Sequence, residues 1–115
     1  MGIDLYVMSD SEECCSQLTA VCRNLASEPD LPELLEEEGC KLFSFVVDEE
    51  EGDAPATFDP KVVLVEVDKA QSVCEALEED QFEFGKEGVL EDLKDLRESV
   101  EKAVELDCRI FLDIG

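Results

Sequence analysis

Residues 61–67 are KVVLVEV, and the interpretation of these seven residues decides the fold. Five of the seven are aliphatic, and Val63, Val65 and Val67 recur at every second position. Side chains at that spacing lie on one face of a β-strand. Valine is also favoured in strands, because its branched side chain packs well on a pleated surface. The stretch therefore predicts a strand.

A second apolar stretch, CKLFSFVV at 40–47, precedes it in the chain. This stretch is apolar at both alternating sets of positions, for example at Leu42 and at Phe43. Such a pattern is typical of a strand that is covered on both faces, so we expect a central strand here. The acid-rich residues 48–60 would then connect the two strands.

Both ends of the chain have strand patterns as well. Residues 2–8 and 108–114 alternate between apolar and polar positions over most of their length, which predicts two further strands. The positions expected to face the core are Ile3, Leu5, Val7, Ile110, Leu112 and Ile114.

Helical spacing occurs between these strands. A capping box at Ser9 or Asp10 predicts that a helix begins there, and a short helix is expected between Asp30 and Gly39. Two more helices are expected, one beginning after Asp68 and one spanning residues 89–106. The expected apolar stripes are Cys14, Leu18, Val21, Cys22 and Leu25; Ala70, Val73, Cys74 and Leu77; and Val89, Leu93, Leu96, Val100 and Ala103.

The order of elements predicts the fold class. We expect a single domain, residues 1–115, with α+β architecture: a two-layer sandwich of β-α-β-β-α-β (ferredoxin-like) order. Its four-stranded antiparallel sheet would carry the helices on one face. The other face of the sheet would then present Tyr6, Leu64 and Phe111, and could support a homodimer or a bound ligand.

The charge of the chain restricts its partners. The sequence has 32 acidic and 9 basic residues and no histidine, for a net charge of −23. Direct binding to nucleic acid or to an anionic membrane is therefore disfavoured, and a basic protein is the favoured partner. The N-terminal residues lack the basic and apolar segments of a signal peptide, so we expect a cytoplasmic protein with reduced thiols.

The sequence contains no recognisable catalytic pattern, so we expect a protein that is not an enzyme and has no cofactor. The six cysteines form no C-x-x-C motif, and no histidine is present to complete a zinc site. The acids around Gly52 do not match a calcium loop. Among the thiols, Cys15 lies off the apolar stripe near an expected helix start, so a redox role centred on it is a third hypothesis.

The segment from Glu28 to Asp53 holds eleven acids and a single base, Lys41. In charge, size and lack of motifs, the chain is similar to immunity proteins that block nuclease toxins and to proteins that imitate the charge of DNA. The sequence thus predicts a small acidic inhibitor that masks the basic surface of a partner protein. A small dimeric ligand-binding or regulatory domain that uses the open sheet face is the alternative. The expected partner-binding residues are Glu36, Glu37, Glu38, Asp48, Glu49, Glu50, Glu51 and Asp53.

Overall fold

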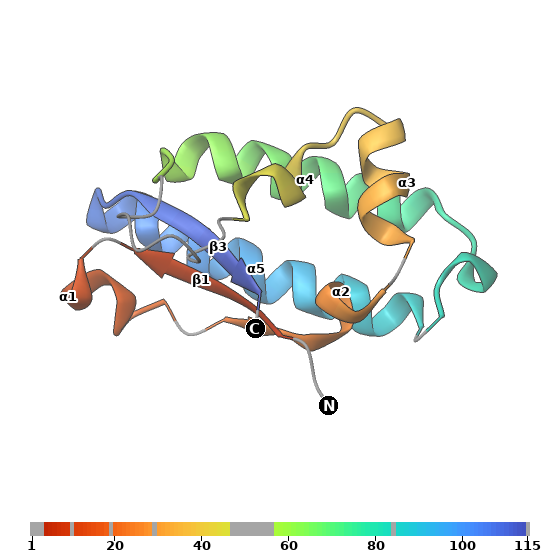
Figure 1. Ribbon diagram of the computed structural model, residues 1–115, viewed down its shortest axis with the longest axis horizontal. Helices are drawn as coiled ribbons and strands as arrows, with labels where there is room; N and C mark the ends of the chain where they lie inside the picture. Colours follow the sequence, from red (N-terminus) through yellow and green to blue (C-terminus); the bar gives the residue numbers. More distant parts are fainter. Residues whose placement is uncertain are drawn as a thin grey trace.

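A computed structural model describes residues 4–9, 11–18, 20–28, 30–46, 57–83 and 85–114 (Figure 1). Over these residues the chain forms three strands, five α-helices and two short 3-10 helices. In chain order the elements are β1 (Leu5–Ser9), α1 (Glu12–Cys15), β2 (Val21–Cys22), α2 (Arg23–Ser27), α3 (Leu31–Glu37), η1 (Leu42–Phe45), α4 (Pro60–Ala76), η2 (Glu79–Gln81), α5 (Lys86–Leu106) and β3 (Ile110–Ile114).

The sheet is antiparallel, and β1 lies at its centre between β2 and β3. In β1, Leu5 and Val7 are buried while Tyr6 and Met8 between them are half-buried, as the alternating sequence predicts. β1 pairs along its whole length with β3, so the strands expected at the two ends of the chain are confirmed, although Ile114, expected to face the core, is 38% exposed. On the far side of β3, single bridges join Val46 to Leu112 and Phe58 to Ile110, without forming a further strand.

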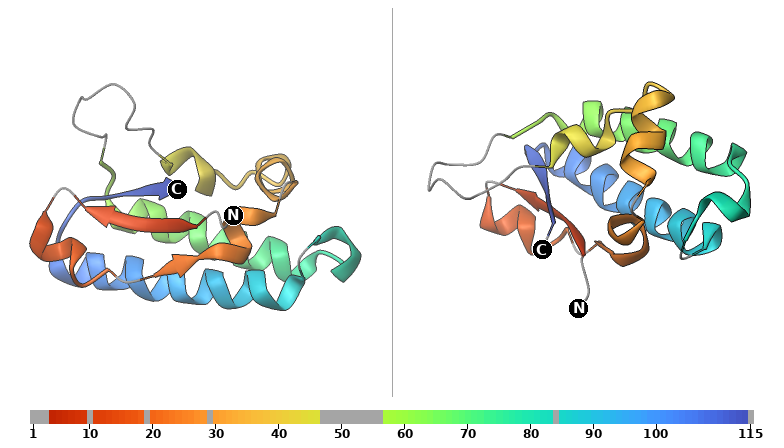
Figure 2. Two further views of the ribbon diagram at one scale, coloured as in Figure 1. Left: turned by 60° about the horizontal axis from the view of Figure 1, so that its bottom comes forward. Right: turned by 45° about the vertical axis from the view of Figure 1, so that its right-hand side comes forward.

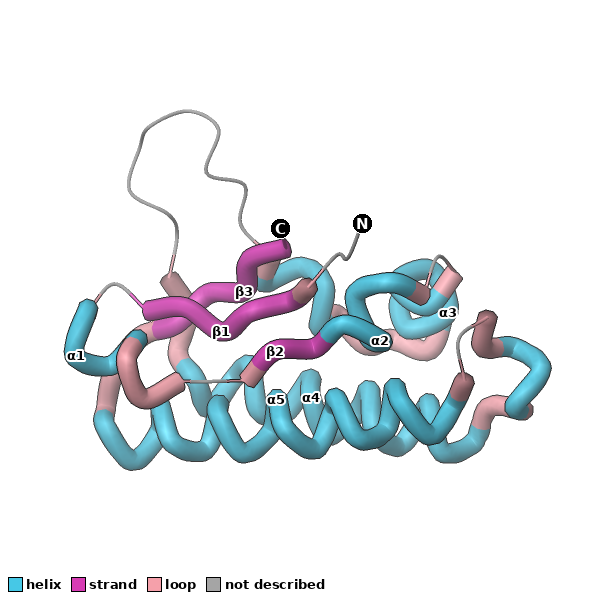
Figure 3. The backbone as a smooth tube through the Cα atoms, turned by 90° about the horizontal axis from the view of Figure 1, so that it is seen from below, coloured by secondary structure: helices cyan, strands magenta, loops and turns pink. Residues whose placement is uncertain are grey.

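Helices α4 and α5 form the second layer, against one face of the sheet (Figure 2; Figure 3). α5 was expected over residues 89–106 and extends over 86–106, so this helix is confirmed. Its buried side chains include every residue of the expected stripe, and they join strand and α4 side chains in a single core. That stripe is Val89, Leu93, Leu96, Val100 and Ala103.

The strand expected at 61–67 is wrong, because these residues lie in α4. The helix begins where Asp59 accepts a hydrogen bond from the backbone N–H of Lys61 (2.9 Å), and Pro60 occupies the first helical turn, where a missing N–H costs nothing. The buried side chains of α4 then recur with helical spacing, which sets the helix's inner face against α5. They are Val63, Val67, Ala70 and Cys74.

The central strand expected at 40–47 is also wrong. Residues 42–45 form η1, in which Leu42 and Phe45 are buried. The ring of Phe45 packs edge-on against Phe58, with 5.0 Å between the ring centroids. These side chains are apolar because they fill the core beside α4, and among the described residues 40–46 only Val46 forms a bridge to β3.

The single helix expected after Asp10 is divided into α1, β2 and α2. Cys22 pairs with Leu5 across the sheet, and Val21, expected on the buried stripe, is 50% exposed. α2 starts directly after β2, where the buried Asp92 carboxylate of α5 accepts a hydrogen bond from the N–H of Leu25 (3.0 Å). A cap supplied by a distant residue leaves no local signal in the sequence.

The ferredoxin-like order with a four-stranded sheet is therefore wrong. Of its expected strands, 61–67 is helical, 40–47 contains the 3-10 helix Leu42–Phe45, and a two-residue strand appears within an expected helix. The described chain is a small α+β fold with a three-stranded antiparallel sheet. Helix α5 and both long strands agree with the sequence patterns, whereas the helix expected to begin after Asp68 begins at Pro60.

Candidate protein-binding surface

The expected partner-binding acids are divided between described and undescribed parts of the chain. Glu36 and Glu37 lie in the last turn of α3, and Glu38 follows as its C-cap; all three are exposed. The remaining five lie outside the described residues, so the structure does not place them relative to α3. They are Asp48, Glu49, Glu50, Glu51 and Asp53.

α3 holds its acids outward because its other face is buried. Leu31 and Leu35 are in the core, one turn apart. The helix ends at Gly39, whose φ of +82° is a left-handed conformation that favours glycine. The next residue, Cys40, donates its N–H to the carbonyl of Leu35 (2.8 Å) and so fixes the end of the helix. The polar face of α3 is therefore firmly oriented.

One side of α3 faces η2 across an open groove of about 410 Å³. Four carboxylates line it, and no base is found among the described residues that line it. We call this feature the acidic groove; its lining residues are Asp30, Glu33, Leu34, Glu37, Asp80 and Gln81. Asp80 is more than 40 residues from α3 in the sequence, and the fold brings it beside this helix.

The wall of the acidic groove formed by η2 is anchored by a buried carboxylate. Glu28, 4% exposed, accepts a hydrogen bond at Oε2 from the N–H of Glu83 (2.8 Å). Gln81 accepts one from the N–H of Glu78 (3.1 Å), which closes a capping box around η2. Lys86 donates to the carbonyls of Glu75 and Leu77 at 2.7 Å each, at the end of α4. The acids of the groove are thus carried on a fixed backbone.

The other side of α3 borders α4 across a second groove, of about 550 Å³. We call it the valine groove, after its exposed apolar side chain, Val65. Val62 lies one turn before Val65 on α4, and each of the two is 53% exposed. The residues that line the groove are Glu38, Gly39, Val65, Asp68, Lys69, Ser72 and Val73. Sequence reasoning missed Val62 and Val65, because it placed them in a strand.

Many of the described bases contact groups outside the acidic groove. Arg97 pairs with Asp68 (3.0 Å) and with Glu101 (3.3 Å), between α4 and α5. Arg23 pairs with Asp4 (3.2 Å) at the sheet. Exposed pairs of this kind contribute at most about 1 kcal/mol each to stability. None of the described bases lines the acidic groove, although Lys86 lies beside η2 at the end of α4.

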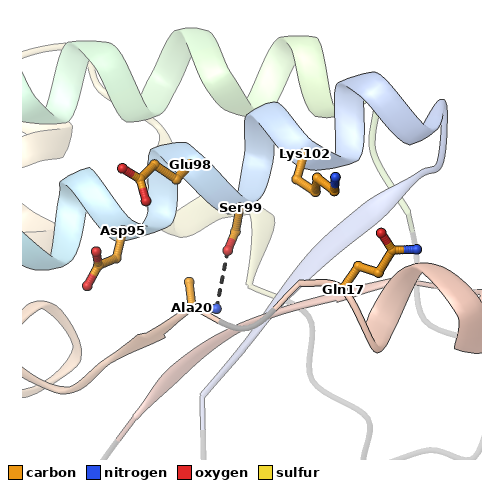
Figure 4. Close-up of a pocket in the computed structure, with 6 residues that line it drawn as sticks. All are labelled: Gln17, Ala20, Asp95, Glu98, Ser99 and Lys102. Carbon is orange, nitrogen blue, oxygen red and sulfur yellow. Dashed lines mark hydrogen bonds between the residues drawn. The ribbon is translucent and has the colours of Figure 1, made fainter.

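A third hollow, of about 420 Å³, lies between α5 and the segment before β2 (Figure 4). The buried Ser99 accepts a hydrogen bond at Oγ from the N–H of Ala20 (3.2 Å), the bond drawn as a dashed line. Asp95, Glu98 and Lys102 surround it on α5. This hydrogen bond holds the segment before β2 on α5.

The thiols have structural contacts. Cys15 Sγ accepts a hydrogen bond from the N–H of Ser9 (2.9 Å) and donates one to its carbonyl (3.0 Å), so it extends the pairing at the end of β1. Burial raises the pKa of Cys22 to about 12 and that of Cys74 to about 11. Burial also raises the pKa of Cys40. Thiols with raised pKa values are neutral and unreactive at neutral pH.

The open sheet face differs from the one expected. Tyr6 and Met8 of β1 lie beside Val21, Asp113 and Phe111 of the neighbouring strands, but Phe111, expected to be exposed on this face, is buried. Tyr6 donates its hydroxyl to Asp4 (3.2 Å). Leu64, expected on this face, belongs to α4 and packs against the core, because residues 61–67 are helical.

Within the described ranges, no group of three potential ligands is placed to hold a metal ion. None of the helices that the structure describes combines the length and the apolar character needed to cross a membrane. Comparisons of the chain with protein-family models, with curated proteins and with solved structures find no match.

Proposed function

We propose that the protein is a non-enzymatic binding protein whose acidic surface occupies the basic surface of a partner protein. The observation that supports this most is the acidic groove, where carboxylates from α3 and from the region of η2 line one hollow without a base among its described lining residues. A basic side chain of a partner would meet several carboxylates there at once. The proposal extends to inhibition, since a partner whose basic surface is covered cannot use it to bind nucleic acid.

The charge of the whole chain acts in the same direction. At −23 the protein attracts cations over several ångströms, and this attraction raises association rates at low salt. The acidic groove directs this general attraction to one place on the surface, because the backbone of its η2 wall is anchored through Glu28. Fixed charges lose less conformational freedom on binding than charges on mobile segments.

Charge reversal tests the proposal with a matched control. The probe is a lysine-rich, fluorescently labelled peptide, and binding is measured by anisotropy at several salt concentrations. One triple variant, Glu33→Lys, Glu37→Lys and Asp80→Lys, changes the groove. The control, Glu91→Lys, Asp95→Lys and Glu98→Lys, changes the exposed face of α5. Each reversal adds two positive charges, so both variants move the net charge from −23 to −17.

The groove variant should bind the peptide at least about tenfold more weakly than the control variant does. Its salt dependence should also be shallower, because fewer ions are displaced on binding. Equal losses in both variants would mean that net charge alone governs binding, and would contradict a role for the groove. Thermal melting of each variant shows that the comparison is between folded proteins.

A further inference from the structure

We propose that the outer face of α4, together with the valine groove, is a docking site for an amphipathic helix of the basic partner. The partner helix would place aliphatic side chains on Val62 and Val65, and lysine or arginine side chains beside Glu38 and Asp68. This inference rests on the proposed function for the sign of the partner's charge. It adds apolar contacts to the electrostatic ones and assigns them to one amphipathic helix of the partner.

The geometry of α4 fits a helix. Val62, Val65, Lys69 and Ser72 are spaced by three, four and three residues, so they form one stripe along the exposed side of α4. At 1.5 Å per residue, this stripe is about 15 Å long, enough for three turns of a partner helix. Val62 and Val65 are the apolar part of this stripe, and exposed apolar side chains beside a groove are the kind of contact that an amphipathic helix uses.

The opposite wall of the valine groove permits close approach. Gly39 lines it and has no side chain, and no atom lies within 4 Å of the position a Cβ would take. Val73 adds a further apolar side chain to the lining, about two turns beyond Val65 along α4. A helix seated here would therefore contact valine side chains on one side and bare backbone on the other.

The two valines are unusual for their position. Branched side chains lose rotamer freedom in a helix, so at exposed positions valine offers no advantage over alanine, glutamate or lysine. The neighbouring helix α5 shows the ordinary arrangement, since all of it is described and no large hydrophobic side chain on it is exposed. Val62 and Val65 would gain from their apolar character once a partner covers them.

The charges around the valine groove favour a basic partner over a second copy of this chain. The charged residues that line the groove are Glu38, Asp68 and Lys69, a net charge of −1; Asp68 also pairs with Arg97 (3.0 Å), and Lys69 lies 3.5 Å from the carboxylate of Glu66. A second copy would bring a further charge of −23 to this face, and repulsion would oppose the contact. A helix with basic flanks would be attracted to it.

The test uses two designed 18-residue peptides of identical leucine and lysine composition. In the first, leucines occupy one helical face and lysines both flanks; in the second, the leucines are scattered. Binding of each is measured to the wild-type protein, to the double variant Val62→Thr and Val65→Thr, and to Val21→Thr as a control. Threonine keeps the branched shape and the charge, and its helix propensity is close to that of valine. Val21 is the matching control because it is similarly exposed, but on β2.

The double variant should bind the amphipathic peptide at least about tenfold more weakly than the wild type, and the scattered peptide equally well. Val21→Thr should change neither. If the double variant binds the amphipathic peptide as the wild type does, the docking site is overturned. If both peptides bind equally and both depend on the acidic groove, the proposed function stands and this inference falls.

Two other outcomes overturn the inference differently. If neither peptide binds the wild type, the proposed function falls and the docking site with it. If sedimentation shows a wild-type dimer that the double variant dissociates, the occupant of the valine face is a second copy of the chain.

Discussion

Helices α4 and α5 lie side by side and bury their inner faces against each other and the sheet, yet their outer faces are opposite in character (Figure 1). α5 exposes charged and polar side chains and buries a regular apolar stripe. α4 buries an equally regular stripe but also exposes Val62 and Val65. Two helices in the same layer therefore follow the same packing rules and differ in what they present to solvent.

This difference explains why one helix could be predicted and the other could not. On α5, polar residues separate the apolar positions, so the helical period is clear. On α4, apolar residues occupy both faces near Val62–Val65, and the period disappears into a continuous apolar run. Such a run is also the pattern of a buried strand. A place where local pattern and fold disagree is often a place where function has selected the residues.

The largest expected effect is in the core that the two helices share. Leu96 of α5 is fully buried between α4 and the sheet, so Leu96→Ala should lower the free energy of unfolding by about 2–5 kcal/mol. Urea denaturation measures the change. A loss below about 1 kcal/mol would show that this part of the core is loosely packed.

A pH effect should come from the inner face of α4. Because burial raises the pKa of Cys74 to about 11, its thiol stays protonated when the same thiol in the unfolded chain has already ionised. The unfolded state then binds fewer protons, so stability falls as pH rises from about 8.5, the ordinary thiol pKa, towards 11. The slope approaches about 1.4 kcal/mol per pH unit for one thiol.

Urea denaturation between pH 7.5 and 10.5 measures this slope. Cys74→Ala should be less stable at neutral pH but should lose stability less steeply above pH 9 than the wild type does. Equal slopes in the two proteins would mean that Cys74 ionises in the folded state as easily as in the unfolded one.

We expect Asp92 of α5 to fix the start of α2. Asp92→Ala removes the carboxylate that accepts from the N–H of Leu25 and leaves that donor buried. The expected loss of stability is about 1–3 kcal/mol. Asp95→Ala, one turn along the exposed face, is the control and should change stability by no more than about 0.5 kcal/mol. Similar losses of stability in the two variants would show that Asp92 does not cap α2.

The smallest expected effect concerns two neighbouring valines of α4, one exposed and one buried. It tests most directly whether the outer face of α4 differs from its inner face. Val62→Ala should leave stability within about 0.5 kcal/mol of the wild type, because alanine is the better helix former and little burial is lost. Val63→Ala, at a fully buried position, should lose about 2 kcal/mol. Equal losses would show that Val62 is already covered in the isolated protein.

The parts of the fold that could be predicted are those whose side chains have one polar and one buried face. The alternation in β1 and the stripe of α5 belong to this class, and both were found. The strand expected at 40–47 is wrong because Leu42 and Phe45 fill the core from a 3-10 helix rather than from a strand. The break between α1 and α2 depends on Asp92 and Ser99, which are about 70 to 80 residues away in the chain.

The candidate site was predictable only in its composition. Glu36, Glu37 and Glu38 were expected on the surface and lie there. That Glu37 shares a groove with Asp80, while Glu38 borders α4, depends on how α3 is turned between two other elements. Residue spacing within one helix shows which side chains share a face, but not which distant segment that face meets.

The pairing of β1 with β3 has a consequence for the synthesis of the chain. The hydroxyl of Ser9 donates to the carbonyl of Arg109 (2.7 Å), across a separation of 100 residues. At roughly 5–20 residues per second, β1 leaves the ribosome about 5–20 s before β3 has been made. During that interval the two-residue strand β2 is the only partner in the described sheet available to β1. The nascent chain therefore presents an unpaired strand edge to chaperones, and the sheet closes only after residue 114 has emerged.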